Sequence, residues 1–469
     1  MTDTAGTRPG RRPWLDWGIV ATFLLLPQSY VLFFSSSEFG ASLLSRAPIF
    51  LVPAVLVAVR LARPHVRQPS AVDPVVVFLW VVVLAQGLIM GLIYTDYPTN
   101  VLSGYGQYAF WFALVAVFIG CVAQEAGLYV FDLMRRYFIA VSAIAWVFVA
   151  LFLVFGTELP HRTVLMPAAG GDILLAQNYY LTVAYSGHSV LGADVPRFTF
   201  FYREPRILGV QLVMGLMLEL GHLRGHWSAW TGGQRWRGVA ALSLMGGALF
   251  WTHSLHGYIF AACGAVAVGL AWSSQTWFWR RFRAVHVGIL LGGVALLVAA
   301  FVVIGRRSDF QTLAELAVAQ GYVGDPDVAP VTLYDIVGKG PALVAEYLTT
   351  YLSSPRGLLL FPLGRGIMNL DNERFLRVFG VSTTGGGTLL QVFAQNAGFV
   401  GVLAFGVIVW RLLGRMQRLV VAAPEWEVRH ACLLGGFLLV VSTVYLDLVS
   451  MSAFTLLIFG AIMHLRLKT

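Results

Sequence analysis

Three arginines and one glutamate stand at the start of a single apolar run, as Arg197, Arg203, Glu204 and Arg206 in RFTFFYREPRILGVQL. A charge beside hydrocarbon costs several kcal/mol unless it is paired or lines a wet cavity, so this crowding indicates a functional site. Pro205 suits the first helical position and Glu204 suits the positive end of a helix dipole. The predicted helix would therefore present its N-terminal amides, with Arg203 and Arg206, to a phosphate or diphosphate.

The alternative for this stretch is a structural clamp, in which Glu204 pairs with one neighbouring arginine. Three arginines exceed what one carboxylate can neutralise, which favours the binding site.

A second polar group is the turn WTHSLHG, residues 251–257, where His253, Ser254 and His256 interrupt an apolar region. Histidine can move a proton near neutral pH, so either imidazole could act as a general base. The alternative is a pair of hydrogen-bonded interfacial histidines. No cysteine or carboxylate stands at metal-ligand spacing here, so no metal site is predicted.

A third group is the glycine-rich segment 359–406, whose glycines allow the backbone to approach a ligand and whose Arg365 adds positive charge. The segment lacks the GxxxxGK[ST] pattern of a P-loop. Without a nucleotide-binding motif or cytoplasmic domain, no cofactor is predicted, and the substrate is expected to carry the energy for the reaction.

The composition of the chain is that of a polytopic membrane protein, with 58% hydrophobic and only 12% charged residues among 469. The elements that position these polar residues are therefore expected to be membrane-spanning helices. The net charge is +9. Most basic residues stand in short loops between apolar runs, where the positive-inside rule explains them, so nucleic acid is not an expected partner. The three cysteines lie inside apolar runs and suggest no disulfide framework: Cys121, Cys263 and Cys432.

Because about 20 apolar residues cross a bilayer core, the sequence predicts twelve transmembrane helices in a single membrane domain, 1–469. Their approximate cores are 17–34, 41–62, 74–94, 104–123, 137–156, 206–223, 238–252, 256–272, 285–304, 389–411, 430–446 and 448–465. Arg8, Arg11 and Arg12 place the N-terminus in the cytoplasm, and arginines follow the even-numbered segments, which places the C-terminus there as well. Leu24 to Phe34 offers no convincing signal-peptide cleavage site, so the first segment is expected to be a retained span.

Two long loops then fall on the outer face, at 157–205 and 305–388. Both are rich in aromatic and apolar residues, unlike disordered segments. Helical spacing in DFQTLAELAVAQGY and GPALVAEYLTTYL predicts short helices along the membrane surface. The expected fold class is an all-α polytopic membrane protein of about twelve transmembrane helices, with two long outer-face loops carrying short surface helices.

Four short motifs together resemble those of the O-antigen polymerase and ligase superfamily. They are an arginine with a following "EP" element (Arg197 to Pro205), an S-x-x-G turn (Ser254 to Gly257), a late G-x-G loop (Gly364 to Gly366) and a Q-N-x-G-x-x-G pattern (Gln395 to Gly401). The likeness in layout covers about residues 100–465. The chain departs from the family pattern at Arg206, where a small residue is usual, and at Gln395-Asn396, where a histidine-asparagine pair is common.

The resemblance implies a metal-independent glycosyltransferase that uses an undecaprenyl-diphosphate-linked glycan on the outer face of the bacterial cytoplasmic membrane. An acceptor hydroxyl would attack the anomeric carbon, and arginines would neutralise the departing diphosphate. Arg203 and Arg206 are the first candidates for this role, followed by Arg197 and Arg365. The candidate general bases follow in this order: Glu204, His253 and His256.

Polymerisation of lipid-linked oligosaccharide repeat units into a surface polysaccharide is the expected function. The first alternative is a ligase that transfers the glycan to a lipid acceptor, and the second is a lipid-linked oligosaccharide flippase. Expected partners are the lipid-linked oligosaccharide, an acceptor glycan or lipid, and membrane lipids, and a chain-length regulator would fit a polymerase. Charged clusters near predicted outer ends, rather than at the bilayer midplane, favour an enzyme over a transporter.

Overall fold

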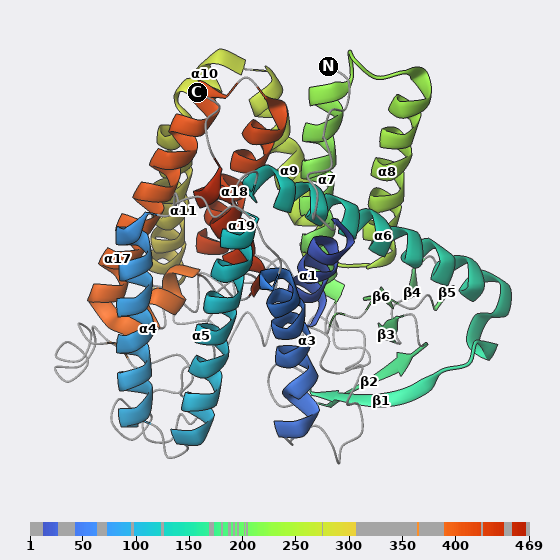
Figure 1. The fold of residues 1–469 in the computed structure, drawn as a ribbon, viewed down its shortest axis with the longest axis horizontal. Coiled ribbons are helices and arrows are strands. Elements are labelled where there is room, and N and C mark those ends of the chain that lie inside the picture. The colour runs from blue at the N-terminus through green and yellow to red at the C-terminus, as the bar shows by residue number, and fades with distance from the viewer. Residues whose placement is uncertain are drawn as a thin grey trace.

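The protein is represented by a computed structural model, shown in Figure 1. It describes residues 13–26, 43–62, 73–94, 98–122, 126–167, 173–179, 182–185, 189–190, 193–194, 197–200, 202, 205–273, 275–305, 364, 389–423, 425–444 and 453–465.

Helices dominate the described chain, and each of the twelve predicted apolar segments overlaps one of them. They are α1 (Pro13–Leu25), α3 (Leu43–Leu61), α4 (Pro74–Tyr94), α5 (Pro98–Cys121), α6 (Ala126–Phe155), α7 (Pro205–His226), α8 (Gly232–Trp251), α9 (Leu255–Ser273), α11 (Phe282–Gly305), α17 (Leu389–Ala422), α18 (Trp426–Val444) and α19 (Ala453–His464), with a short additional helix, α10 (Gln275–Arg280). Four of them, α4, α6, α7 and α17, contain stretches long and apolar enough to cross a membrane, and several others are shorter and apolar. A helical membrane protein is therefore supported.

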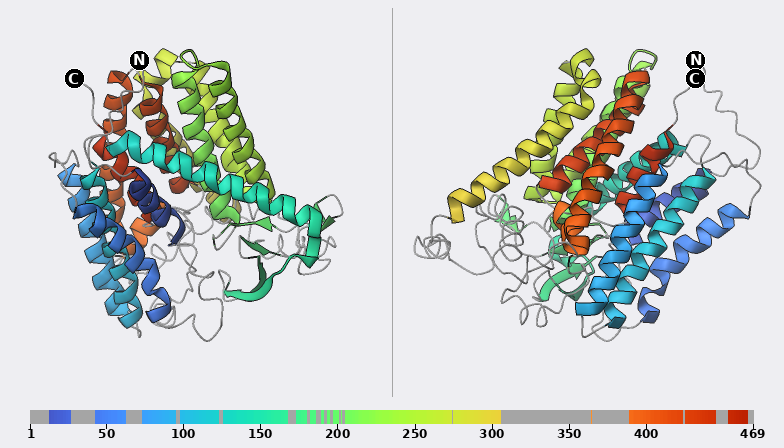
Figure 2. Two further views of the ribbon diagram at one scale, coloured as in Figure 1. Left: turned by 45° about the vertical axis from the view of Figure 1, so that its right-hand side comes forward. Right: turned by 90° about the vertical axis from the view of Figure 1, so that its left-hand side faces the viewer.

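The core lies where α7 packs against α6, α8, α9 and α18, while α17 runs along α4. Large side chains such as Phe138 of α6 and Phe260 of α9 are fully buried in this bundle. At 30 residues, α6 is roughly 45 Å long, and it crosses the bundle obliquely (Figure 2). One helix thus reaches from the centre of the bundle to the strands.

The bundle has two distinct ends (Figure 1). The α10 end carries the turn between α7 and α8 together with α10, whose carbonyl oxygens at Trp279 and Arg280 accept hydrogen bonds from Gln417 of α17. The α8 helix begins there with a capping box between Thr231 and Gln234. The opposite end, the strand end, carries the β-strands.

The first long loop contains strands where the sequence predicted short surface helices. They are β1 (Arg162–Pro167), β2 (Ile173–Asn178), β3 (Val183–Tyr185), β4 (Ser189–Val190), β5 (Ala193–Asp194) and β6 (Arg197–Phe198), preceded by a 3-10 turn, η2 (Gly156–Glu158). Antiparallel pairing gives one sheet in the order β1-β2-β3-β6 and a separate β4-β5 pair. RTVLMP and ILLAQN are apolar runs of strand length separated by a Gly-Gly pair, a pattern that favours a hairpin. The all-α prediction is therefore corrected to a helical bundle with a small sheet.

Of the second long loop, residues 305–388, the structure describes Gly305 and Gly364 only, so the surface helices predicted there lie outside the described residues. Gly364 has φ of 76°, a backbone conformation that glycine favours.

The α17 helix is broken at Ala397 and Gly398, which have non-helical backbone angles, with φ of 55° at Gly398. Asn396, just before the break, is buried, and its Oδ1 accepts a hydrogen bond from the hydroxyl of Tyr105 on α5 at 2.8 Å. A Cβ at Gly401 would collide with the carbonyl oxygen of Phe393. The Q-N-x-G-x-x-G pattern thus forms a kink tied to α5.

Candidate functional site

Arg197 is held by aromatic packing between the small sheet and α6. It pairs with Tyr185 of β3 in the sheet, and the ring of its neighbour Phe198 lies 5.8 Å from that of Phe148 on α6. Tyr179 packs on the same Phe148 ring, and burial raises the pKa of its phenol. The backbone at Arg197 is consequently fixed against α6.

The chain between β6 and α7 is tightly turned. Phe200 has φ of 53°, and its carbonyl oxygen accepts hydrogen bonds from the hydroxyls of Thr182 and Thr199. The hydroxyl of Tyr202 lies 2.7 Å from that of Tyr137 on α6, and both side chains are buried. These contacts anchor the segment that leads into α7.

The α7 helix begins at Pro205, which confirms the predicted helix start after Glu204. Arg206 stands in the first turn and is partly buried, with its Nε inaccessible to solvent. Helix geometry places Arg206 and Gly209, three residues apart, on the same face of α7. That face meets the turn between α8 and α9.

The turn between α8 and α9 is also well fixed. The hydroxyl of Thr252 donates to the carbonyl oxygen of Leu249 and accepts a hydrogen bond from the amide of Ser254. Ser254 caps α9, because its Oγ accepts from the amide of Gly257 at 3.2 Å. The S-x-x-G pattern is therefore a helix cap.

His253, between these two hydroxyl residues, has φ of 44°, in the left-handed region that non-glycine residues rarely adopt. Its carbonyl oxygen accepts a hydrogen bond from Nη2 of Arg197 at 3.2 Å. Backbone strain of this kind concentrates at functional sites. This contact joins the first polar group of the sequence to the second. We call the set formed by the turn 251–257, which includes His253, together with Arg197 and Arg206, the arginine site.

Two glycines close the arginine site. A Cβ at Gly209 would lie 3.1 Å from Cα of Gly257 and 3.3 Å from Cβ of Ser254. Any side chain at Gly209 would therefore press α7 and the turn apart by a few tenths of an ångström. Arg206 is thereby held close to the turn that contains His253.

One buried polar residue of α7, Gln211, was not predicted from the sequence. Gln211 is 3% exposed, and its buried Oε1 has no hydrogen-bond partner within the described part of the chain. A buried amide without a partner requires an explanation, such as a ligand or water. A glutamine within the apolar run that follows Arg206 was the available signal in the sequence.

Four of the candidate residues lie wholly or partly outside the described part of the chain. Arg203, Glu204 and Arg365 lie outside the described residues, and His256 belongs to α9 but its side chain is not among those described. Of the candidate residues with described side chains, the structure thus brings Arg197 and His253 into contact. Arg206 lies one helical turn before Gly209, which packs against the same turn.

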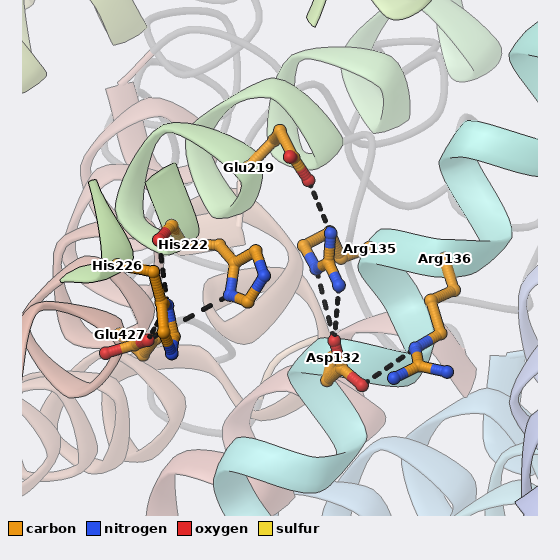
Figure 3. A network of polar contacts seen from close by, with 7 residues as sticks. All are labelled: Asp132, Arg135, Arg136, Glu219, His222, His226 and Glu427. Atoms are coloured by element: carbon orange, nitrogen blue, oxygen red, sulfur yellow. Dashed lines mark hydrogen bonds and ion pairs between the residues drawn. The ribbon is translucent and has the colours of Figure 1, made fainter. Parts of the chain in front are cut away.

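A second polar network lies nearer the α10 end and was not predicted (Figure 3). Arg135 of α6 bridges Asp132 and Glu219, with its Nη1 2.7 Å from the carboxylate of Glu219 on α7. The side chain of Glu219 is 1% exposed and that of Arg135 is 13% exposed, so the carboxylate is buried and depends on this arginine. On the same part of α7, His226 lies 2.9 Å from Glu427 of α18, with His222 beside it.

An apolar cavity of about 350 Å³ opens between α4, α5, α17 and α19. Its lining includes Trp80, Phe112, Leu412 and Phe459. These residues belong to helices other than those of the arginine site, so the cavity is separate from it and suits an acyl or isoprenoid chain rather than a polar group.

Comparisons with protein-family models, with curated proteins and with solved structures found no match for this chain. The functional argument therefore depends on the sequence motifs and on the contacts described above.

Proposed function

We propose that this protein is a membrane glycosyltransferase that polymerises lipid-linked oligosaccharide repeat units on the outer face of the bacterial cytoplasmic membrane. The observation that carries the proposal is the contact between Arg197 and the carbonyl oxygen of His253, in a turn against which Gly209 packs one helical turn beyond Arg206. Two sequence segments that resemble one enzyme superfamily thus meet in space.

The proposed topology has twelve spans and cytoplasmic termini. It puts the α10 end in the cytoplasm and the strand end outside. Basic residues at the α10 end agree with the positive-inside rule: Arg224, Arg235, Arg237, Arg280 and Arg281. The arginine site then lies at the outer membrane interface, where a lipid-borne diphosphate would be found.

In the proposed reaction, a hydroxyl oxygen of the acceptor sugar attacks the anomeric carbon of the donor glycan. The bond between that carbon and the diphosphate oxygen breaks, and the lipid diphosphate leaves with the bonding electrons. Arg203 and Arg206, assisted by Arg197, Arg365 and the first amides of α7, stabilise the developing negative charge. Glu204 takes the hydroxyl proton, with His253 and His256 as the alternative bases.

Reconstitution tests the proposal. The purified protein in liposomes, supplied with a lipid-diphosphate-linked oligosaccharide, should lengthen the glycan on an electrophoretic gel. Arg206→Ala should abolish lengthening, and Arg206→Lys should recover little, because lysine lacks the bidentate geometry of arginine. Arg237→Ala, an exposed arginine of α8 at the α10 end, is the matched control and should be active.

Transfer to a second lipid instead of chain growth would indicate a ligase. Equal activity of Arg206→Ala and Arg237→Ala would refute the role of the arginine site.

A flippase is the second candidate, because the structure contains two buried ion pairs. Asp16 of α1 is fully buried against Arg60 of α3, and Glu219 is paired with Arg135. Intramembrane charges often mark transport pathways. In the same liposomes, movement of the lipid-linked oligosaccharide without bond formation would identify this function.

A further inference from the structure

His222, His226 and Glu427 form a three-residue cluster at the α10 end, away from the arginine site (Figure 3). Each offers one ligand atom, and these atoms lie within 4.8 Å of one another. Two histidines four residues apart share a helix face, and the carboxylate comes from the first turn of a second helix. Two imidazoles and one carboxylate are a ligand set that zinc accepts.

The spacing of the ligand atoms is close to that around a tetrahedral ion. With zinc bonds of about 2.0–2.1 Å, neighbouring ligand atoms are about 3.4 Å apart. Oε1 of Glu427 lies 2.9 Å from Nδ1 of His226 and 3.9 Å from Nδ1 of His222, distances that bracket this value. The remaining pair, from His222 to His226, lies within 4.8 Å, so side-chain rotations would have to bring the two imidazoles closer together around the ion.

Two glycines of α7 allow α18 to pack closely beside the cluster. A Cβ at Gly225 would lie 2.8 Å from both carboxylate oxygens of Glu427, and one at Gly221 would collide with His430. The sequence GHLRGH thus alternates the glycines that allow close approach with the histidines that flank it. Glu427 is consequently held over the last turn of α7.

Partial exposure suits an ion that keeps a water ligand. The side chains of His222 and Glu427 are 25% and 27% exposed, so solvent reaches the cluster. The ring of Trp230 stacks on that of His226 and contacts that of His222, which restricts the orientation of both imidazoles. Nδ1 of His226 also lies 3.1 Å from the carbonyl oxygen of His222, and metal binding would replace this hydrogen bond.

We propose that His222, His226 and Glu427 bind one divalent transition-metal ion of the zinc type, which fastens the last turn of α7 to the first turn of α18. The site is independent of glycosyl transfer at the arginine site. With three protein ligands and one open position, it can hold a water molecule or a further ligand atom.

Cobalt tests the site directly, because Co²⁺ in a tetrahedral nitrogen and oxygen site absorbs visible light. Tag-free, full-length protein in detergent micelles is first treated with EDTA and then titrated with Co²⁺. We expect a visible band that saturates at one equivalent and disappears on addition of Zn²⁺. His226→Gln and Glu427→Gln should each weaken Co²⁺ binding by about tenfold or more, since even the loss of a group that supports a ligand costs about 10–100-fold in metal affinity.

His161→Gln is the matched control, since His161 is an exposed histidine next to the sheet at the strand end. It should bind Co²⁺ as the wild type does. As a second readout, Zn²⁺ should raise the melting temperature of the wild type and of His161→Gln, but not that of His226→Gln. Absence of a band, or equal binding by His226→Gln and His161→Gln, would show that the cluster is only an ion pair.

Discussion

Gly209 of α7 and Gly257 of α9 are in direct contact, since a Cβ on Gly209 would lie 3.1 Å from Cα of Gly257. Their contact determines how near the first turn of α7 comes to the turn that contains His253. The arrangement of the arginine site therefore depends on two residues that have no side chains.

Gly209→Ala should lower both stability and glycan transfer. The added methyl group would press against Gly257 and Ser254, and such overpacking typically costs about 1–3 kcal/mol. Gly269→Ala, at a position of α9 where a Cβ meets nothing within 4 Å, is the control and should be neutral or stabilising by up to about 1 kcal/mol. Thermal unfolding and the liposome assay give the two readouts. Indistinguishable effects of the two substitutions would contradict the contact.

His253→Gly should stabilise the protein by about 1 kcal/mol, because glycine relieves the left-handed backbone at φ of 44°. We expect most of the transfer activity to remain, since the carbonyl oxygen that binds Arg197 is retained and Glu204 is the first candidate base. Glu204→Gln should abolish transfer. A well-folded but inactive His253→Gly protein would instead assign the base to the imidazole.

The ion pair between Arg135 and Glu219 should show strong energetic coupling. Arg135→Met leaves a buried carboxylate without its partner and should cost about 3–5 kcal/mol. The double substitution Arg135→Met with Glu219→Leu should cost about 1–3 kcal/mol less than the sum of the single ones. Denaturant unfolding in detergent micelles gives the free energies of unfolding of the four proteins in this double-mutant cycle. Simple additivity would show that the pair is unimportant to stability.

The contact between Asp73 and Arg411 predicts a weak pH dependence of stability. Partial burial would raise the pKa of the Asp73 carboxyl, but hydrogen bonds from Arg411 and the amide of Val75 hold it below the ordinary value of 3.8. A lowered pKa contributes stability that is present above the ordinary value and is lost as pH falls through the lowered one.

Asp73→Asn should therefore destabilise the protein at pH 7 by about 0.2–1 kcal/mol, because the pair is partly exposed. This difference should shrink when melting temperatures are measured below pH 3.8. High salt should reduce it at neutral pH. A difference that persists unchanged at low pH would rule out the ion pair as its cause.

Gly398→Ala should destabilise α17 by about 1–3 kcal/mol, because its φ of 55° and ψ of −135° strain any side chain. Gly406→Ala, in a regular part of the same helix with open space around it, is the control and should be tolerated. Melting temperatures in micelles compare the two variants. If Gly398→Ala were as stable as Gly406→Ala, the kink would not require glycine.

Local features of the fold could be predicted from the sequence, and contacts between distant segments could not. The start of α7 at Pro205 follows from the preference of proline for the first helical turn. The strands in residues 157–205 were missed because short apolar runs do not distinguish a strand from a helix by periodicity alone.

For the arginine site, residue types indicated where charge gathers but not how it is arranged. The left-handed backbone of His253 could not be anticipated, because non-glycine residues seldom adopt it. The partners Arg135 and Glu219, which are 84 residues apart, depend on which faces of α6 and α7 meet. That choice is made by packing of the whole bundle.

The α7 helix carries Arg206 in its first turn and His226 at its last residue. Its 22 residues make a rod of roughly 33 Å. Because a helix resists stretching, a shift of α7 along its axis must move both of its ends by the same distance. A ligand that fixes the position of His226 at one end of α7 would thereby also fix the position of Arg206 at the other end.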